Sequence, residues 1–229
     1  MIPGVTWDLR TTVKGTLAGL FLAVFIAPLL VVPFDPNLSS LGATLVAQAL
    51  LTAALIGTAI WVARRPQPLA GVRTALGRLG WRPFRPKAIG QMFLMLLAFY
   101  AFVLVYAALI TQPNQENIAD DLGLCRGPIL AGLAVFLICV VAPIAEETFF
   151  RGFLYGGLRG RLSEIPAASI SGLVFGIVHA PTGPTTVIPL AALGFGLALL
   201  YQRTGSIFPG MLAHAINNSI AIASQFHHC

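Results

Sequence analysis

Three short stretches of the sequence place ionisable or amide side chains inside long apolar runs. They are residues 145–151 (AEETFFR), 175–179 (FGIVH) and 214–218 (HAINN). Charged side chains are costly within a membrane, and where they occur they usually face the interior of the protein and serve a function. We therefore take these three stretches as the candidates for chemistry.

The first stretch contains two adjacent glutamates followed by an arginine. Successive side chains point about 100° apart around a helix, so Glu146 and Glu147 are expected to have different partners. Arg151 lies four residues after Glu147 and is predicted to pair with it. Glu146 is then free to act as a general base towards water, a task that suits a carboxylate in apolar surroundings.

The second stretch places His179 33 residues after Glu146. If the helix with the glutamates continues past Arg161 and the chain turns near Ser163, both residues lie roughly 25 Å from that turn, at a rise of about 1.5 Å per residue. An antiparallel pair of helices would then bring His179 beside Glu146 at one depth.

The third stretch places His214 and Asn218 one helical turn apart, on the same face. Both side chains can donate a hydrogen bond to an oxygen that develops negative charge. Asn217 points away from that face and is expected to have a structural role. A carboxylate base, a histidine and two oxyanion donors suit acyl hydrolysis, most simply the cleavage of a peptide bond.

The motifs EExxxR, FxxxH and HxxxN, in this order on successive apolar segments, resemble those of the CPBP family, also called the Abi family. The resemblance covers residues from about 128 to 225. It is a resemblance to intramembrane proteases of the CAAX prenyl protease 2 type and to bacteriocin-processing proteases. It implies hydrolysis of a peptide bond by a glutamate-activated water, without an obligatory zinc ion.

The resemblance also implies a role for each matching position. The implied catalytic residues are Glu146 as the base, His179 as its partner, and His214 with Asn218 as the oxyanion site. The implied supporting residues are Glu147, Arg151 and Phe175.

Three other interpretations stay open. Some proteins of this kind act as membrane scaffolds or in bacteriocin immunity, and would keep the motif residues as a buried network. A proton-coupled transporter could use Glu146 and His179 as a relay, although transporters usually have broken helices in two matching halves. Glu146, Glu147, His179 and His214 carry the atoms that zinc binds, but there is no HExxH motif, and no cofactor is expected.

The cysteines and the remaining histidines do not suggest a further site. Cys125, Cys139 and Cys229 are odd in number and share no close spacing, so neither a disulfide framework nor a zinc knuckle is expected. His227 and His228 lie at the end of the chain, where frayed structure is common, and are not expected to bind a metal.

The composition indicates that the motifs lie in a membrane protein. Hydrophobic residues make up 57% of the chain and charged residues 10%, with a mean hydropathy of +0.84, which is too apolar for a soluble domain. The net charge of +6 comes from basic residues between apolar runs and not from one soluble face, so no nucleic-acid partner is expected. The expected partners are the lipid bilayer and a membrane-associated peptide or protein. Prenylated carboxyl termini, bacteriocin leaders and signalling peptides all remain candidate substrates.

The lengths of the apolar runs predict an all-α polytopic bundle of about seven transmembrane spans. Proline, glycine and charged residues mark the ends of these runs. The resemblance to prenyl proteases allows eight. The predicted spans are 15–32, 41–63, 88–110, one that begins at Pro128, 167–180, 185–202 and 207–225. We divide the chain into an N-terminal region, 1–127, with three spans and a basic loop at 64–87, and a catalytic core, 128–229. The loop is expected to hold a short interfacial helix at 72–79.

The basic residues predict the orientation of the chain in the membrane. With the N-terminus in the cytoplasm, twelve Lys and Arg residues fall on the cytoplasmic side and only Arg126 falls outside. The positive-inside rule therefore favours a cytoplasmic N-terminus and, with seven spans, an external C-terminus. GxxxG pairs, such as Gly15/Gly19 and Gly172/Gly176, would suit close helix packing.

Overall fold

The computed structural model describes residues 4–35, 41–65, 71–110 and 127–225, and these residues form helices and turns with no strand. The first half contains α1 (Leu9–Phe21), η1 (Leu22–Ile26), α2 (Ala27–Val31), α3 (Leu41–Ala63), α4 (Val72–Arg78) and α5 (Lys87–Leu109). The second half contains α7 (Pro128–Phe136), η2 (Leu137–Val141), α8 (Ala142–Glu146), η3 (Glu147–Tyr155), α9 (Gly156–Leu158), α10 (Glu164–Val178), η4 (Ala180–Thr182), η5 (Pro184–Thr186), α11 (Val187–Thr204) and α12 (Phe208–Gln225). The predicted all-α bundle is confirmed.

Five stretches of the described residues are long and apolar enough to cross a membrane. They are Leu9–Val31, Leu45–Ala63, Lys87–Leu109, Pro128–Leu158 and Pro184–Thr204. The other two predicted spans also occur as helices: α10 is apolar but has only 15 residues. Helix α12 has 18 residues, and His214, Asn217 and Asn218 make it less apolar. The residues of the candidate site therefore lower the hydropathy of the helix that carries them.

Two helix boundaries differ from the predicted ones by more than three residues. The first helix begins at Leu9, six residues before the predicted start, because the Asp8 side chain accepts a 2.8 Å hydrogen bond from the N–H of Thr11 and caps it. The prediction that the glutamate-bearing helix continues past Arg161 is wrong, since it ends at Leu158. A turn follows near Ser163, as predicted, in which the Arg159 side chain donates to the carbonyl of Leu162, and α10 begins at Glu164, three residues before the predicted span.

The two short π-helical stretches have a common cause in proline. η1 ends two residues before Pro28, and η2 ends two residues before Pro143. A proline inside a helix has no N–H to donate and its ring collides with the preceding turn, so the backbone there widens to i→i+5 hydrogen bonds. The chain continues as one helix through each proline, from Leu9 to Val31 and from Pro128 to Leu158.

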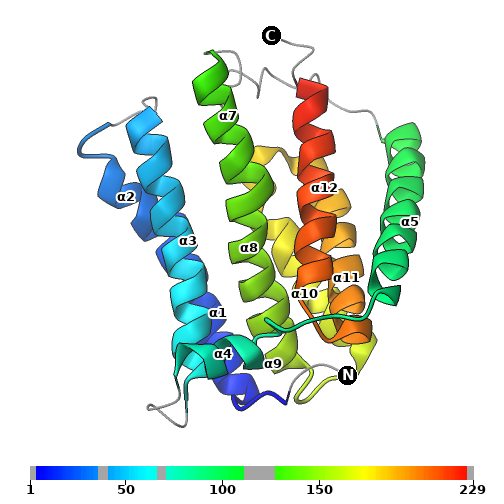
Figure 1. Ribbon diagram of the computed structural model, residues 1–229. Helices are drawn as coiled ribbons and strands as arrows, with labels where there is room; N and C mark the ends of the chain where they lie inside the picture. Colours follow the sequence, from blue (N-terminus) through cyan, green and yellow to red (C-terminus); the bar gives the residue numbers. More distant parts are fainter. Residues whose placement is uncertain (1–3, 36–40, 66–70, 111–126, 226–229) are drawn as a thin grey trace.

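The helices form a bundle with α5 at one side and α1 and α3 at the other, as Figure 1 shows. Helices α7, α8 and α12 lie between them, with α10 and α11 behind, and α4 lies across one end. The start of α1 and the end of α12 lie at opposite ends of the bundle (Figure 1). The basic residues belong to the end where α1 and α5 begin and α3, α9 and α11 finish. They are Arg10, Lys14, Arg64, Arg65, Arg73, Arg78, Arg82, Arg85, Lys87, Arg159, Arg161 and Arg203. This gathering is what the positive-inside rule leads one to expect of the cytoplasmic end, and the orientation stays a prediction.

Glycines allow the helices around the site to approach closely. A Cβ atom built on Gly19 would lie 2.6 Å from the ring of Phe149, and one on Gly15 would lie 2.6 Å from the ring of Phe153. The two aromatic rings of η3 therefore pack against α1 where these glycines have no side chain. One buried cluster includes Leu55 of α3 as well as both phenylalanines, so residues from the two predicted regions share a core.

Helices α10 and α11 approach each other most closely at glycine. A Cβ atom on Gly172 would lie 2.6 Å from the carbonyl oxygen of Ala191, and one on Gly194 would lie 2.8 Å from the Cα atom of Gly172. Backbone therefore packs directly on backbone at this crossing. This contact holds the start of α11 beside Phe175 and the end of α10, where His179 lies.

Candidate active site

Glu146 and Glu147 lie at the junction where α8 passes into the π-helical η3. The hydroxyl of Thr148 donates a 2.7 Å hydrogen bond to the carbonyl of Ile144, and that of Ser171 donates a 3.1 Å bond to the carbonyl of Phe150. Side-chain hydroxyls thus satisfy backbone acceptors at both ends of the junction. Such bonds distort helices locally, and π-helical segments often occur at functional sites.

Glu147 and Arg151 form the predicted ion pair, with 2.7 Å between Oε1 and Nη1 and both side chains fully buried. The Arg151 guanidinium also lies 4.5 Å from the centre of the Phe175 ring and within 3.4 Å of the Gly194 carbonyl oxygen. A charged pair removed from water needs such additional contacts to offset its desolvation. The buried pair therefore has a defined position at the inner side of the site.

Glu146 is oriented differently from Glu147, as predicted, and is 14% exposed. Its Oε2 atom lies 3.9 Å from Nε2 of His179 and 3.7 Å from Nε2 of His214. Both distances exceed that of a direct hydrogen bond, and this oxygen has no hydrogen-bond partner among the described residues. The antiparallel helices thus bring His179 beside Glu146, although the first of them ends earlier than expected.

His179 directly follows α10 and is held by the helix it ends. Its Nδ1 lies 2.7 Å from the carbonyl oxygen of Phe175, and the two rings are 4.6 Å apart. A carbonyl oxygen only accepts hydrogen bonds, so Nδ1 carries the proton and Nε2 of the neutral ring is an acceptor. The spacing in the FxxxH motif therefore fixes both the orientation and the tautomer of the histidine.

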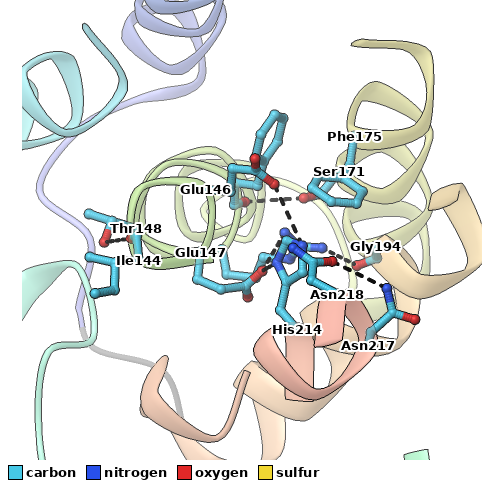
Figure 2. A network of polar contacts seen from close by, with 12 residues as sticks. Ile144, Glu146, Glu147, Thr148, Ser171, Phe175, Gly194, His214, Asn217 and Asn218 are labelled. Carbon is cyan, nitrogen blue, oxygen red and sulfur yellow. Dashed lines mark hydrogen bonds and ion pairs between the residues drawn. The ribbon is translucent and has the colours of Figure 1, made fainter. Parts of the chain in front are cut away.

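His214 lies between the two glutamates, with dashed lines to both in Figure 2. Its Nδ1 is 3.2 Å from Oε1 of Glu147, and its ring is buried against Phe175 at 5.6 Å. A carboxylate paired with an arginine only accepts hydrogen bonds, so Nδ1 is the donor and Nε2 faces Glu146.

Asn218 lies one turn after His214 on α12, and its Nδ2 donates a 2.9 Å hydrogen bond to the carbonyl of Ile138 in η2. An amide nitrogen has two hydrogens, so one remains for another acceptor. The carbonyl of Ile138 lies in the stretch widened ahead of Pro143. The backbone that widens ahead of Pro143 thus supplies the hydrogen-bond acceptor for Asn218.

A tyrosine from the first half of the chain reaches this network, which sequence reasoning missed. The Tyr100 hydroxyl on α5 donates a 3.1 Å hydrogen bond to Oδ1 of Asn217. Asn217 Nδ2 in turn lies 3.4 Å from Oδ1 of Asn218 (Figure 2). Asn217 therefore links Tyr100 to Asn218 through its side-chain amide. No local pattern around Tyr100 signals this contact, which depends on how α5 packs against α12.

The donor atoms at the centre of the site are of the kinds that zinc binds. Metal-bound histidines commonly donate their other N–H to a carbonyl or carboxylate, as His179 and His214 do here. Among the described residues, however, no group of three or more His, Cys, Asp or Glu side chains is close enough to hold a metal ion. Cys139 is a buried free thiol. The other cysteines and the terminal histidines (Cys125, His227, His228 and Cys229) lie outside the described residues.

Comparison with known proteins supports the interpretation of the second half of the chain. Residues 128–220 match the family described as "Type II CAAX prenyl endopeptidase Rce1-like". A stretch of 93 residues is 34% identical to a protein of Bacillus subtilis (strain 168) named "Putative membrane peptidase YdiL". That match covers 41% of this chain and 37% of the relative. No solved structure matches the chain. The resemblance to the CPBP family that the three motifs indicate is confirmed for residues 128–220.

Proposed function

We propose that this protein is an intramembrane endopeptidase in which Glu146 activates a water molecule to cleave a peptide bond. The observation that carries the proposal is the position of Glu146 Oε2, which faces the Nε2 atoms of two histidines at 3.7 and 3.9 Å. Separations of this size between polar atoms suit a bridging water. The membrane-peptidase name of the relative and the endopeptidase family match support the same reaction class.

The tautomers of His179 and His214 favour a water molecule that donates hydrogen bonds to two acceptors at once. Because the Nδ1 atoms of His179 and His214 donate to other groups, their Nε2 atoms accept hydrogen bonds when the rings are neutral. A water at Glu146 can donate one hydrogen to Oε2 and the other to Nε2 of His179. Both donors of the water are then occupied, and its lone pairs point to the substrate carbonyl.

In the chemical step, the water oxygen bonds to the peptide carbonyl carbon while Glu146 takes a proton from the water. The carbonyl oxygen becomes an oxyanion in a tetrahedral intermediate. The C–N bond then breaks as Glu146 returns the proton to the leaving nitrogen. The products are a free carboxyl end and a free amino end, and no metal or cofactor is required by this balance.

Asn218 and His214 would stabilise the oxyanion in unequal ways. The free N–H of Asn218 can donate whatever the protonation state of the site. His214 can donate from Nε2 only when its ring is cationic, because Nδ1–H is already directed to Glu147. The proposed oxyanion site therefore has Asn218 as its constant donor, and His214 joins it when protonated.

The depth of the site favours a membrane-embedded segment as the substrate. His179 lies about 22 Å along α10 from Glu164, at about 1.5 Å per residue, within a hydrocarbon core of about 30 Å. Glu146 and His179 are 14% and 26% exposed, so both reacting groups are partly accessible. We propose a membrane-associated peptide or protein, drawn into the bundle, as the substrate class.

A non-catalytic scaffold is the second candidate. It is favoured by the complete burial of Glu147 and Arg151, since a buried network could be retained for structure alone. In a scaffold, Glu146 would need only to keep its shape, and its charge would be dispensable.

The Glu146→Gln variant decides between the two functions, because it keeps the shape of the side chain and removes its basicity. Wild-type and variant protein in liposomes would be given the same membrane peptides, and the products compared by mass spectrometry. We expect the variant to release no product, with an unchanged unfolding temperature. Glu164→Gln is the matched control and should cleave normally, since it changes a carboxylate at the start of α10. Equal product from wild type and Glu146→Gln would disprove the proposed mechanism.

A further inference from the structure

An apolar groove runs between α5 and α11, on the side of α11 away from the candidate active site. It encloses about 340 Å³ and is lined mainly by Leu94, Met95, Phe99, Phe102, Phe195 and Leu199. Gly196 also lines it, and a Cβ atom there would lie 2.9 Å from Sδ of Met95. The groove therefore lies within the membrane-spanning part of both helices, and the absence of a side chain at Gly196 leaves room for Met95 beside it.

The length of the groove matches one leaflet of a bilayer. On α5 its lining extends from Gln91 to Phe102, and on α11 it extends from Arg203 back to Ala192. Each stretch covers about 16 Å at a rise of about 1.5 Å per residue, and half of the hydrocarbon core is about 15 Å thick. An acyl chain that enters from one membrane surface would fill it to the midplane.

The groove ends in a basic cavity of about 620 Å³ at the end of the bundle where the basic residues gather. Its described lining contains no carboxylate and four basic side chains, those of Arg82, Arg85, Lys87 and Arg203. Gln91 and Arg203 line both the groove and this cavity, so the two spaces adjoin. An apolar channel that ends in concentrated positive charge complements an amphiphile with a negative head.

Residues 80–82 of the basic loop are held in place by the turn between α11 and α12. Arg82 Nε donates a 2.6 Å hydrogen bond to the carbonyl of Gly205, and the hydroxyl of Ser206 donates one of 2.6 Å to the carbonyl of Arg82. The N–H of Ile207 also binds the carbonyl of Gly80 at 3.1 Å. The backbone that leads from Arg82 to the start of α5 is therefore anchored beside the groove at Arg82.

Gln91 supplies an independent sign of a ligand at the junction of the two spaces. Its Oε1 atom is buried and has no hydrogen-bond partner among the described residues. Buried polar atoms are normally paired, because leaving one unpaired carries a desolvation penalty. A hydroxyl or amine of a lipid headgroup or glycerol backbone at this level would provide the partner once the Gln91 side chain turns towards it.

We propose that this groove is a binding site for an anionic phospholipid. One acyl chain lies between α5 and α11, the phosphate binds Arg85, Lys87 and Arg203, and Gln91 binds a headgroup or glycerol group. The site is independent of the proposed peptidase activity, since none of its residues belongs to the Glu146 network.

Native mass spectrometry of the full chain, released from nanodiscs of equal phosphatidylglycerol and phosphatidylcholine, tests the proposal. Wild-type protein should retain phosphatidylglycerol preferentially. The triple variant Arg85→Gln/Lys87→Gln/Arg203→Gln should lose that preference by roughly a hundredfold, at about fivefold per cation. The control Arg10→Gln/Arg73→Gln/Arg161→Gln removes three exposed charges of the same end that line neither space, and should keep the preference.

A second pair of variants tests the acyl groove. Ala98 lines it on α5, and Ala98→Phe should displace either lipid. Ala107→Phe lies half a turn away around the same helix, at an exposed position outside the lining, and should change nothing. Equal retention of the two lipids by wild type, an equal loss in the charge control, or displacement of the lipid by inorganic phosphate would each overturn the proposal.

Discussion

Nδ1 of His214 lies 3.2 Å from Oε1 of Glu147, and neither side chain reaches the surface. Oε1 of the same glutamate is 2.7 Å from Nη1 of Arg151, so one carboxylate oxygen serves an arginine and a histidine together. Because an ionised carboxylate only accepts hydrogen bonds, this contact determines which nitrogen of His214 carries the proton. Glu147 thus determines which tautomer of His214 faces Glu146.

Removing one partner of the buried Glu147–Arg151 pair is expected to destabilise the protein more than removing both. Glu147→Ala should lower the free energy of unfolding by about 3–5 kcal/mol, because it leaves the buried Arg151 uncompensated. The double variant Glu147→Met/Arg151→Met should recover most of this loss while remaining inactive. Denaturant unfolding in detergent measures both. A single variant as stable as wild type would show that the buried Arg151 does not depend on Glu147 for charge compensation.

His179 is expected to act through Nε2, while Nδ1 only orients the ring. In His179→Asn, the shorter amide can still donate to the carbonyl of Phe175 but has no group at the position of Nε2. The variant should therefore fold normally and lose cleavage by about 10²–10⁴-fold, the usual contribution of a group that assists proton transfer. Activity within threefold of wild type would instead assign His179 a role in packing against Phe175.

The sequence was sufficient to predict the helical segments and the main partners at the site. Apolar length located the seven long helical stretches found among the described residues, and the four-residue spacing from Glu147 to Arg151 predicted an ion pair that the structure contains. The equal distances of Glu146 and His179 from a turn near Ser163 predicted their approach. Each of these features depends on local periodicity or on chain length, which a sequence displays directly.

Other features could not be predicted because they depend on packing between distant segments. Tyr100 reaches Asn217 across 117 residues, and nothing near Tyr100 in the sequence indicates it. The π-helical turns before Pro28 and Pro143 shift helical phase, whereas the predictions assumed a regular α-helix. The division at residue 127 stays a prediction, although α3 and η3 share a buried cluster.

Tyr100 is expected to position Asn218 through Asn217. Tyr100→Phe removes one hydroxyl and should lower kcat by about fivefold with KM unchanged, the effect of one net hydrogen bond. Tyr106→Phe is the matched control, since its hydroxyl, on the same helix, donates to the carbonyl of Thr185 away from this network. Equal kcat values for the two variants would rule out transmission through Asn217.

A glutamate mechanism without metal predicts that strong chelators leave cleavage unchanged. Purified protein dialysed against such a chelator should keep its activity, and metal analysis should find less than one zinc ion in ten chains. The zinc alternative predicts the reverse, with activity restored by added zinc, because Glu146, His179 and His214 would then serve as ligands. Restoration by zinc alone would replace the proposed mechanism with a metal-dependent one.

Gly210 provides a test of how closely α12 must approach the glutamates. A Cβ atom built there would lie 2.8 Å from Oε2 of Glu147, an oxygen that is buried and without a hydrogen-bond partner among the described residues. Gly210→Ala should therefore push Glu147 from its position, lower the free energy of unfolding by about 1–3 kcal/mol and reduce cleavage, because the contact with His214 is lost. Gly90→Ala is the matched control in α5, where a Cβ atom meets nothing within 4 Å, and it should stabilise the helix by up to about 1 kcal/mol. Unfolding and cleavage measured on the two variants separate a specific collision with Glu147 from a general effect of alanine. If Gly210→Ala behaves like Gly90→Ala in both measurements, Glu147 has room to move, and its position does not depend on the absence of a side chain at residue 210.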